Sequence, residues 1–125
     1  NLGSQVMFFK EITENLKNAL IAKSNIFVMP SIISKTSVEG FGISYVEAAQ
    51  YSVPSLGGKD GGASDAIKHD KTGIICDGNN LEDIYSSLNL MIENKKYIEL
   101  GKNAKEFVSK FQWHKIIEDY KKILN

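Results

Sequence analysis

Residues 25–49, NIFVMPSIISKTSVEGFGISYVEAA, combine a short apolar run, a polar loop with two glycines and the start of a helical pattern. The apolar run ends at Pro30, which cannot donate a hydrogen bond to a strand ladder. It therefore predicts a buried strand, whereas the spacing of apolar residues from Ile43 onward predicts a helix. A strand, a loop and a helix in this order form the repeating unit of an α/β protein.

The rest of the chain repeats this alternation of strands and helices. Further short apolar runs predict strands at residues 6–9, 53–56 and 72–76. Apolar residues three and four apart predict helices at residues 14–23, 81–92, 100–111 and 113–123. Parallel pairing follows, because parallel strands need long crossovers. The sequence thus predicts a single domain over residues 1–125: an open, doubly wound, Rossmann-like parallel sheet with a helical C-terminal tail.

Composition and charge exclude several classes of function. Basic and acidic side chains number 15 each, so the formal net charge is zero, which argues against nucleic acid as a partner. The longest apolar runs are far too short to span a membrane, and we expect a cytoplasmic protein. The single cysteine, Cys76, lies inside an apolar run and is predicted to be a small buried side chain.

The loop after the strand at 25–29 contains the residues best suited to bind a ligand. In an open α/β sheet, ligands bind beyond the carboxyl ends of the strands. Gly40 and Gly42 flank Phe41, so the backbone there can approach a ligand closely. The amides of residues 42–44 would lie at a helix N-terminus, where unpaired donors can bind phosphate.

Two carboxylates accompany these amides. Glu39 precedes the predicted helix and Glu47 lies one turn inside it, eight positions later. A carboxylate can accept both hydrogens of a sugar diol, so the segment suits a sugar nucleotide. The residues alone leave other interpretations open, since a Gly-x-Gly loop is a common turn and a glutamate in a first helical turn often complements the helix dipole.

Several motifs, in order, resemble the retaining glycosyltransferase family 4 (glycosyl transferases group 1), which has the GT-B fold. Residues 39–48, EGFGISYVEA, are similar to its E-x7-E signature. Residues 26–31 resemble its strand ending in Pro-Ser, and 52–54 its Gly-x-Pro segment, with Ser52 in place of glycine. Residues 61–65 resemble its Gly-Gly-x-x-Glu turn, with Asp65 for glutamate. Residues 72–75 and 111–113 match its later strand and last helix.

The resemblance assigns a role to each site residue. Glu39 would be the catalytic residue, contacting hydroxyls of the donor hexose, and Glu47 would bind the ribose hydroxyls. The remaining donor-binding residues would be Ser31 near the base or ribose, Gly40, Phe41, Gly42 and Ile43 through backbone groups, and Gly61 and Gly62 beside the cleft. The family generally works without an essential metal, so no metal or other cofactor is expected.

The family also implies what these 125 residues lack. Two strand-helix units that carry an Arg and a Lys for the leaving diphosphate, and the whole acceptor domain, would precede residue 1. The chain is then expected to be the donor-binding part of a truncated C-terminal domain, inactive alone. In the parent, a hexose would pass to a glycan or lipid acceptor, with peripheral membrane contact. The alternatives are a stand-alone nucleotide-sugar or partner-binding module, or part of a GT-B sugar-nucleotide epimerase.

Two expectations concern the folded chain itself. The absent strands would leave the strand at 25–29 with an open edge. Residues 6–9 would then either pair with that edge, or a second chain would fill it, giving a marginally stable or self-associating protein. We also expect Gly42→Val to abolish donor binding while leaving the melting temperature within a few degrees of the wild type.

Overall fold

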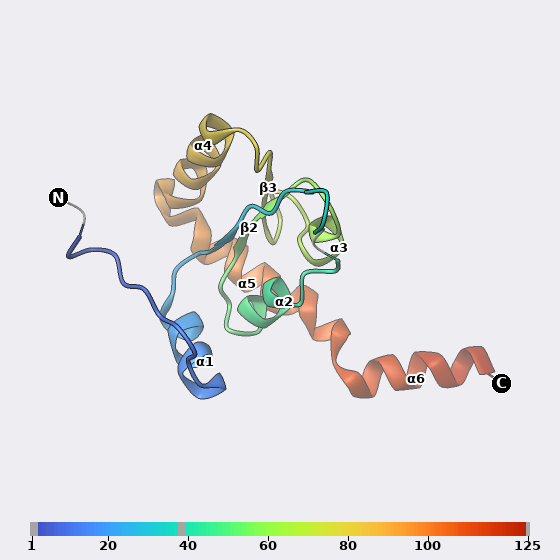
Figure 1. Cartoon of the computed structure of the whole chain (residues 1–125). Helices are drawn as coiled ribbons and strands as arrows, with labels where there is room; N and C mark the ends of the chain where they lie inside the picture. Colours follow the sequence, from blue (N-terminus) through green and yellow to red (C-terminus); the bar gives the residue numbers. More distant parts are fainter. Residues whose placement is uncertain (1–2, 38–39, 125) are drawn as a thin grey trace.

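The computed structural model describes residues 3–37 and 40–124. In this part of the chain the sheet consists of β1 (Phe27–Met29), β2 (Ser55–Gly58) and β3 (Gly73–Cys76), in the order β1-β2-β3 (Figure 1). The helices are α1 (Glu14–Lys23), α2 (Ile43–Gln50), α3 (Ala63–Ala66), α4 (Leu81–Ile92), α5 (Lys96–Val108) and α6 (Trp113–Leu124). Single 3-10 turns, η1 (Glu93–Lys95) and η2 (Ser109–Phe111), follow α4 and α5.

Both strand pairs are parallel, and helices join them. In β2, Leu56 lies opposite Val28 of β1 and Ile74 of β3. Helix α2 connects β1 to β2, and the short α3 connects β2 to β3. The predicted α/β architecture with parallel strands and crossover helices is therefore confirmed.

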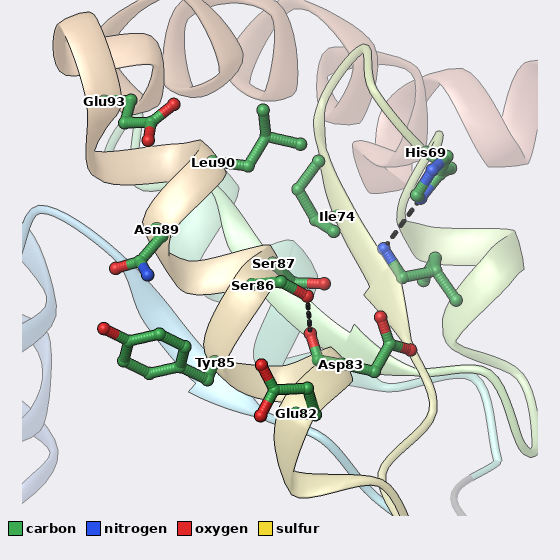
Figure 2. Close-up of a pocket in the computed structure, with 11 residues that line it drawn as sticks. His69, Ile74, Glu82, Asp83, Tyr85, Ser86, Ser87, Asn89, Leu90 and Glu93 are labelled. Atoms are coloured by element: carbon green, nitrogen blue, oxygen red, sulfur yellow. Dashed lines mark hydrogen bonds between the residues drawn. The ribbon is translucent and has the colours of Figure 1, made fainter.

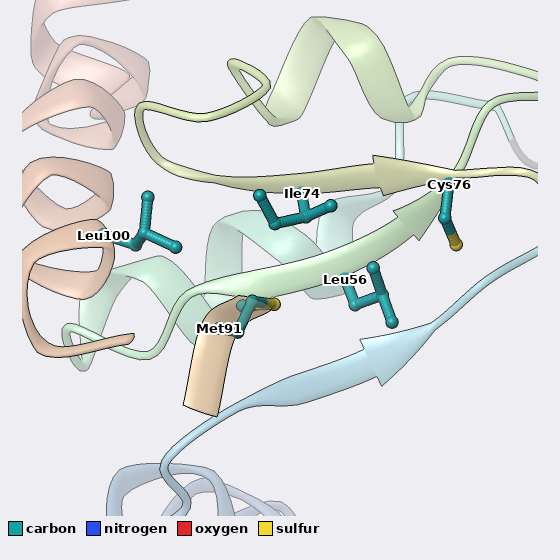
Figure 3. Packing of buried hydrophobic residues seen from close by; sticks show 5 residues of the cluster. All are labelled: Leu56, Ile74, Cys76, Met91 and Leu100. Atoms are coloured by element: carbon teal, nitrogen blue, oxygen red, sulfur yellow. The ribbon is translucent and has the colours of Figure 1, made fainter. Parts of the chain in front are cut away.

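One face of the sheet carries the main apolar core, shown in Figure 3. Leu56, Ile74 and Cys76 point from β2 and β3 toward Met91 of α4 and Leu100 of α5. All five are at most 2% exposed. Burial raises the pKa of the Cys76 thiol, so this side chain is a packed apolar group, as predicted, and a poor nucleophile.

The opposite face packs against α2 and α3. Tyr45 of α2 is 1% exposed and forms a cluster with Ala63, Ala66 and Ile67. Phe27 and Met29 of β1 pack against this cluster, whereas Val28 between them points to the other face. Helices thus cover both faces of the sheet, which is the doubly wound arrangement that the sequence predicts.

The strand predicted at residues 6–9 does not form. These residues are extended and exposed, with 78% of Met7 and 93% of Phe8 accessible to solvent, and they pair with no strand among the described residues. The prediction that they pair with the strand at 25–29 in their own chain is therefore wrong. An apolar run becomes a strand only where a neighbouring strand offers its hydrogen-bonding groups.

Two other boundaries differ from the sequence-based prediction. The strand predicted at 53–56 begins two residues later, because Pro54 precedes the ladder and contributes only its carbonyl, which accepts a hydrogen bond from the Phe27 amide at 3.0 Å. The predicted break before the last helix is confirmed at η2 and Gln112. Helix α6 extends away from the sheet in Figure 1. In the described part of the chain, every helix is too short or too polar to cross a membrane.

Candidate functional site

The start of α2 has the backbone geometry that the predicted phosphate site needs. Gly42 precedes the helix in the left-handed conformation, with φ 79° and ψ 58°. The Tyr45 amide donates to the Gly42 carbonyl at 2.9 Å, so the helix begins with a tight turn. The first amides of a helix have no partner within the helix and carry its positive dipole end. An anion placed before Ile43 would meet these donors.

Gly42 also faces a packed aromatic ring. A Cβ atom on Gly42 would collide with the ring of Tyr45, which is 1% exposed. Tyr45 is held from two sides: its hydroxyl donates to the Met29 carbonyl at 2.7 Å, and its ring meets Phe27 edge-on at 6.1 Å. The structure therefore revises the expectation that Gly42→Val leaves the melting temperature nearly unchanged.

The loops that follow the three strands contact one another through glycines. A Cβ on Gly58, at the end of β2, would collide with the Ser31 backbone after β1. A Cβ on Gly62 would collide with the Gly40 carbonyl, and one on Gly78, after β3, with the Pro30 carbonyl. The predicted ligand-binding loops are thus brought together at the carboxyl edge of the sheet. Gly62 is required there for close backbone packing.

The predicted site residues in these loops lie as follows. Ser31 is half-buried, and its amide donates to the Met29 carbonyl at 2.8 Å. Gly61 is exposed with φ 82°, a conformation that favours glycine. The Phe41 side chain is 40% exposed and meets Phe111 of η2 edge-on at 5.4 Å. Ile43 is 70% exposed at the first position of α2. Glu39 lies outside the described residues.

Glu47 is placed where a carboxylate could reach a ligand at this helix end. It lies four residues after Ile43, so the two side chains share one face of α2, and helical side chains lean toward the N-terminus. Its side chain is 32% exposed. Oε1 of Glu47 accepts a hydrogen bond from Nζ of Lys17, on α1, at 3.0 Å.

Lys17 is the neighbour that the sequence did not reveal. Its Nζ also lies 2.9 Å from Oε1 of Glu14, one turn earlier on α1. The hydrogen bonds that Lys17 donates to Glu14 and, second in size, to Glu47 raise its pKa above the ordinary value. From the sequence, Glu14 and Lys17 look like an ordinary i,i+3 surface pair, and nothing in their spacing indicates a contact with α2.

A second polar pair lies beside the loops at the carboxyl edge. Nζ of Lys59, directly after β2, donates to Oδ2 of Asp77 after β3 at 2.6 Å. Asp77 also accepts from the Asn79 amide at 2.9 Å. The hydrogen bond from Lys59, and to a smaller extent that from the Asn79 amide, lowers the pKa of Asp77. Asp77 in turn raises the pKa of Lys59. This pair ties together the segments that follow β2 and β3.

A hollow of about 590 Å³ at the free edge of β3 lies apart from these residues. Figure 2 shows its wall of side chains from α4, including Glu82 and Tyr85, and Glu93 of η1, with His69 across β3. Nδ1 of His69 accepts from the Ile75 amide at 3.0 Å, so this histidine covers the exposed edge of β3. None of the described site residues predicted from sequence lines this hollow.

Comparison with known proteins decides the family. The family model "Glycosyl transferases group 1" matches residues 1–107. The chain belongs to the group 1 glycosyl transferases. The match includes both E-x7-E glutamates and the strand-end loops, whereas α6 lies beyond it. The resemblance of the motifs is therefore confirmed at the level of the family.

Individual relatives agree with the family assignment. The chain is 32% identical over 95 residues to the GDP-mannose-dependent alpha-(1-6)-phosphatidylinositol monomannoside mannosyltransferase of Mycobacterium tuberculosis, covering 74% of this chain and 24% of that protein. It is 29% identical over 103 residues to sucrose-phosphate synthase 4 of Arabidopsis thaliana, covering 81% of this chain and 9% of that protein. The 125 residues thus span about a quarter of the mannosyltransferase.

Solved glycosyltransferase structures share the fold. Sucrose-phosphate synthase from Thermosynechococcus elongatus superposes with a TM-score of 0.82 at 22% identity, over 98% of this chain and 30% of that chain. HepE from Anabaena, solved in complex with UDP, superposes with a TM-score of 0.72 at 24% identity, over 84% of this chain and 28% of that chain. The parallel sheet and its flanking helices therefore share the fold of GT-B glycosyltransferases.

Proposed function

We propose that these residues bind the nucleoside diphosphate part of a sugar nucleotide, as the donor-binding part of a retaining glycosyltransferase that transfers a hexose. The observation that carries the proposal is the start of α2. There a left-handed Gly42 opens a helix whose second turn holds a half-buried carboxylate, Glu47. Amide donors for phosphate and a carboxylate acceptor for hydroxyls then lie on one helix, at the carboxyl edge of a parallel sheet.

The chemistry divides between the two ends of the donor. The diphosphate would lie against the backbone of residues 40–43, which offers N–H donors and no charge to repel it. Glu47, one turn further along, would accept hydrogen bonds from the ribose hydroxyls. Ser31 and the glycines 61 and 62 would border the nucleoside from the neighbouring loops. Glu39 is proposed as the catalytic residue that contacts the hexose.

Relatives support the class of donor. The mycobacterial mannosyltransferase is named for GDP-mannose, and HepE was solved in complex with UDP-glucose. Both are nucleoside diphosphate sugars, with the ribose and diphosphate that the α2 site is proposed to recognise. The base and the sugar are left open, so both a guanine and a uracil nucleotide serve as probes.

We further propose that these 125 residues bind the donor without transferring its sugar. Transfer needs the departing diphosphate to be stabilised and water to be excluded from the reacting centre. The present residues cover about a quarter of the mannosyltransferase and, in our proposal, supply one wall of the site. A glycan or lipid acceptor would bind to other parts of a longer protein. If the acceptor is a lipid, that protein would act at a membrane surface. The site needs no metal.

Calorimetric titration of the chain with GDP and UDP tests this proposal. One of the two nucleotides should bind with a simple one-site isotherm, and EDTA should leave its affinity unchanged. Glu47→Gln keeps the shape of the side chain but removes its charge, which should weaken binding by roughly 1.5–3 kcal/mol. A wild-type chain that binds neither nucleotide, or a Glu47→Gln chain that binds as tightly as wild type, would contradict the proposal.

A further inference from the structure

Lys17 joins two elements through the carboxylate that is proposed to hold the ribose. Its Nζ lies 3.0 Å from Oε1 of Glu47 and 2.9 Å from Oε1 of Glu14. The side chains of Lys17 and Glu47 are 33% and 32% exposed, so both are partly withdrawn from water, whereas Glu14 is 69% exposed. The contact with Glu47 spans 30 positions of sequence, from α1 to α2.

A contribution to stability alone would not explain why this ion pair is placed here. Partly exposed ion pairs contribute little to folding. Helix α1 is already attached to α2 through Ile21, which packs with Ala48 and Val53 in a small apolar cluster. The contact between Lys17 and Glu47 must therefore be judged by what it does to the Glu47 carboxylate.

Lys17 restricts that carboxylate in a way that suits a diol. A carboxylate has two oxygens, each able to accept hydrogen bonds. Lys17 binds Oε1, and a side chain fixed through one oxygen loses the rotational freedom that a ligand would otherwise have to restrict. The other oxygen, Oε2, is then the acceptor offered to a ligand.

The charge of Lys17 also suits an anionic ligand. A nucleoside diphosphate carries negative charge, and an unpaired Glu47 on the same helix would repel it. Lys17 is protonated at neutral pH, and the hydrogen bonds that it donates to Glu14 and Glu47 raise its pKa further. A carboxylate paired with this ammonium can accept hydroxyl hydrogens with less repulsion of the phosphates.

We propose that Lys17 is a positioning residue for the nucleotide: it holds Glu47 through Oε1 and presents Oε2 to the ribose hydroxyls. This inference rests on the proposed function of Glu47. It assigns to α1, which none of the sequence motifs involves, a part in recognising ribose. Lys17 acts through Glu47 and makes no contact with the nucleotide itself.

Affinities for GDP and 2′-deoxy-GDP, and for UDP and 2′-deoxy-UDP, measured by calorimetry on the same variants, test this role. In the wild type, loss of the 2′-hydroxyl should weaken binding by roughly tenfold, since the lost bond is to a charged acceptor. Glu47→Gln should reduce that ratio to near one, and Lys17→Met should reduce it likewise. Lys17→Arg should restore part of it. Adding Lys17→Met to Glu47→Gln should change nothing further.

Lys122→Met is the matched control, because Lys122 forms an i,i+3 pair with Asp119 at 2.9 Å on α6, outside the residues that we assign to the site. It should leave the ratio unchanged. The inference is overturned if Lys17→Met keeps the wild-type ratio while Glu47→Gln removes it. It is also overturned if Lys17→Met weakens both nucleotides equally, which indicates only a structural effect. A wild type that binds no GDP or UDP would overturn the proposed function and, with it, this inference.

Discussion

Replacing Gly42 by alanine adds one methyl group at the start of α2, and two independent costs follow. The residue would keep a φ of 79°, which costs an L-amino acid roughly 1–2 kcal/mol. Its Cβ would also collide with the Tyr45 ring, and forcing an extra methyl into a packed core costs roughly 1–3 kcal/mol. The sum is about 3 kcal/mol, or a fall in melting temperature of roughly 10–15 °C for a domain of this size.

Gly40→Ala is the matched control, because a Cβ on Gly40 would meet no atom within 4 Å. A surface change of this kind should alter the free energy of unfolding by less than about 0.5 kcal/mol. Thermal melting followed by circular dichroism, with calorimetric titration of GDP and UDP, measures both effects. The Gly42→Ala chain should melt well below the Gly40→Ala chain and bind nucleotide more weakly than the wild type. Equal melting temperatures would refute the packing argument for Gly42.

Two further predictions follow from surface contacts and exposed segments. Lys59 lowers the pKa of Asp77, and Asp77 raises that of Lys59, so their ion pair stabilises the fold at intermediate pH and is lost as pH falls through the lowered pKa of Asp77 or rises through the raised pKa of Lys59. Below about pH 4 the melting temperature should therefore fall more steeply with decreasing pH for the wild type than for Asp77→Asn. Equal slopes for the two chains would contradict this. The exposed apolar residues 6–9 and the open edge of β1 should make the chain self-associate. Light scattering after size exclusion should give a molecular mass that rises with protein concentration for the wild type and equals that of the monomer for Phe8→Lys. A wild-type chain that is monomeric at every concentration would contradict this prediction.

The sequence predicted those elements whose patterns carry their own boundary signals. β1 ends before Pro30 and β3 before the polar Asp77, so both were placed to within two residues. Helix α4 was placed from its apolar stripe. The strand predicted at 6–9 failed because strand formation depends on a neighbour, which hydrophobicity alone does not supply.

The glycines and Lys17 show what the sequence could not reveal about the site. Gly62 lies in a motif that resembles a turn and Gly58 in no sequence motif, yet each is required where the backbone of a loop distant in sequence passes against it. The role of Glu47 was suggested by its spacing from Glu39, but its contact with Lys17 depends on how α1 packs beside α2. Such long-range contacts leave no periodic pattern in a single sequence.

Amide chemical shifts measured during titration with GDP or UDP test the central claim most directly. The chain, at 13.9 kDa, is small enough for every assigned backbone amide to report. The account predicts that the largest shifts occur at Gly42, Ile43 and Ser44, with smaller ones at Glu47, and that Glu47→Gln weakens the response at all four. Shifts centred instead on His69, Tyr85 and Glu93 would place the nucleotide in the hollow between α4 and the edge of β3 and contradict the proposed site.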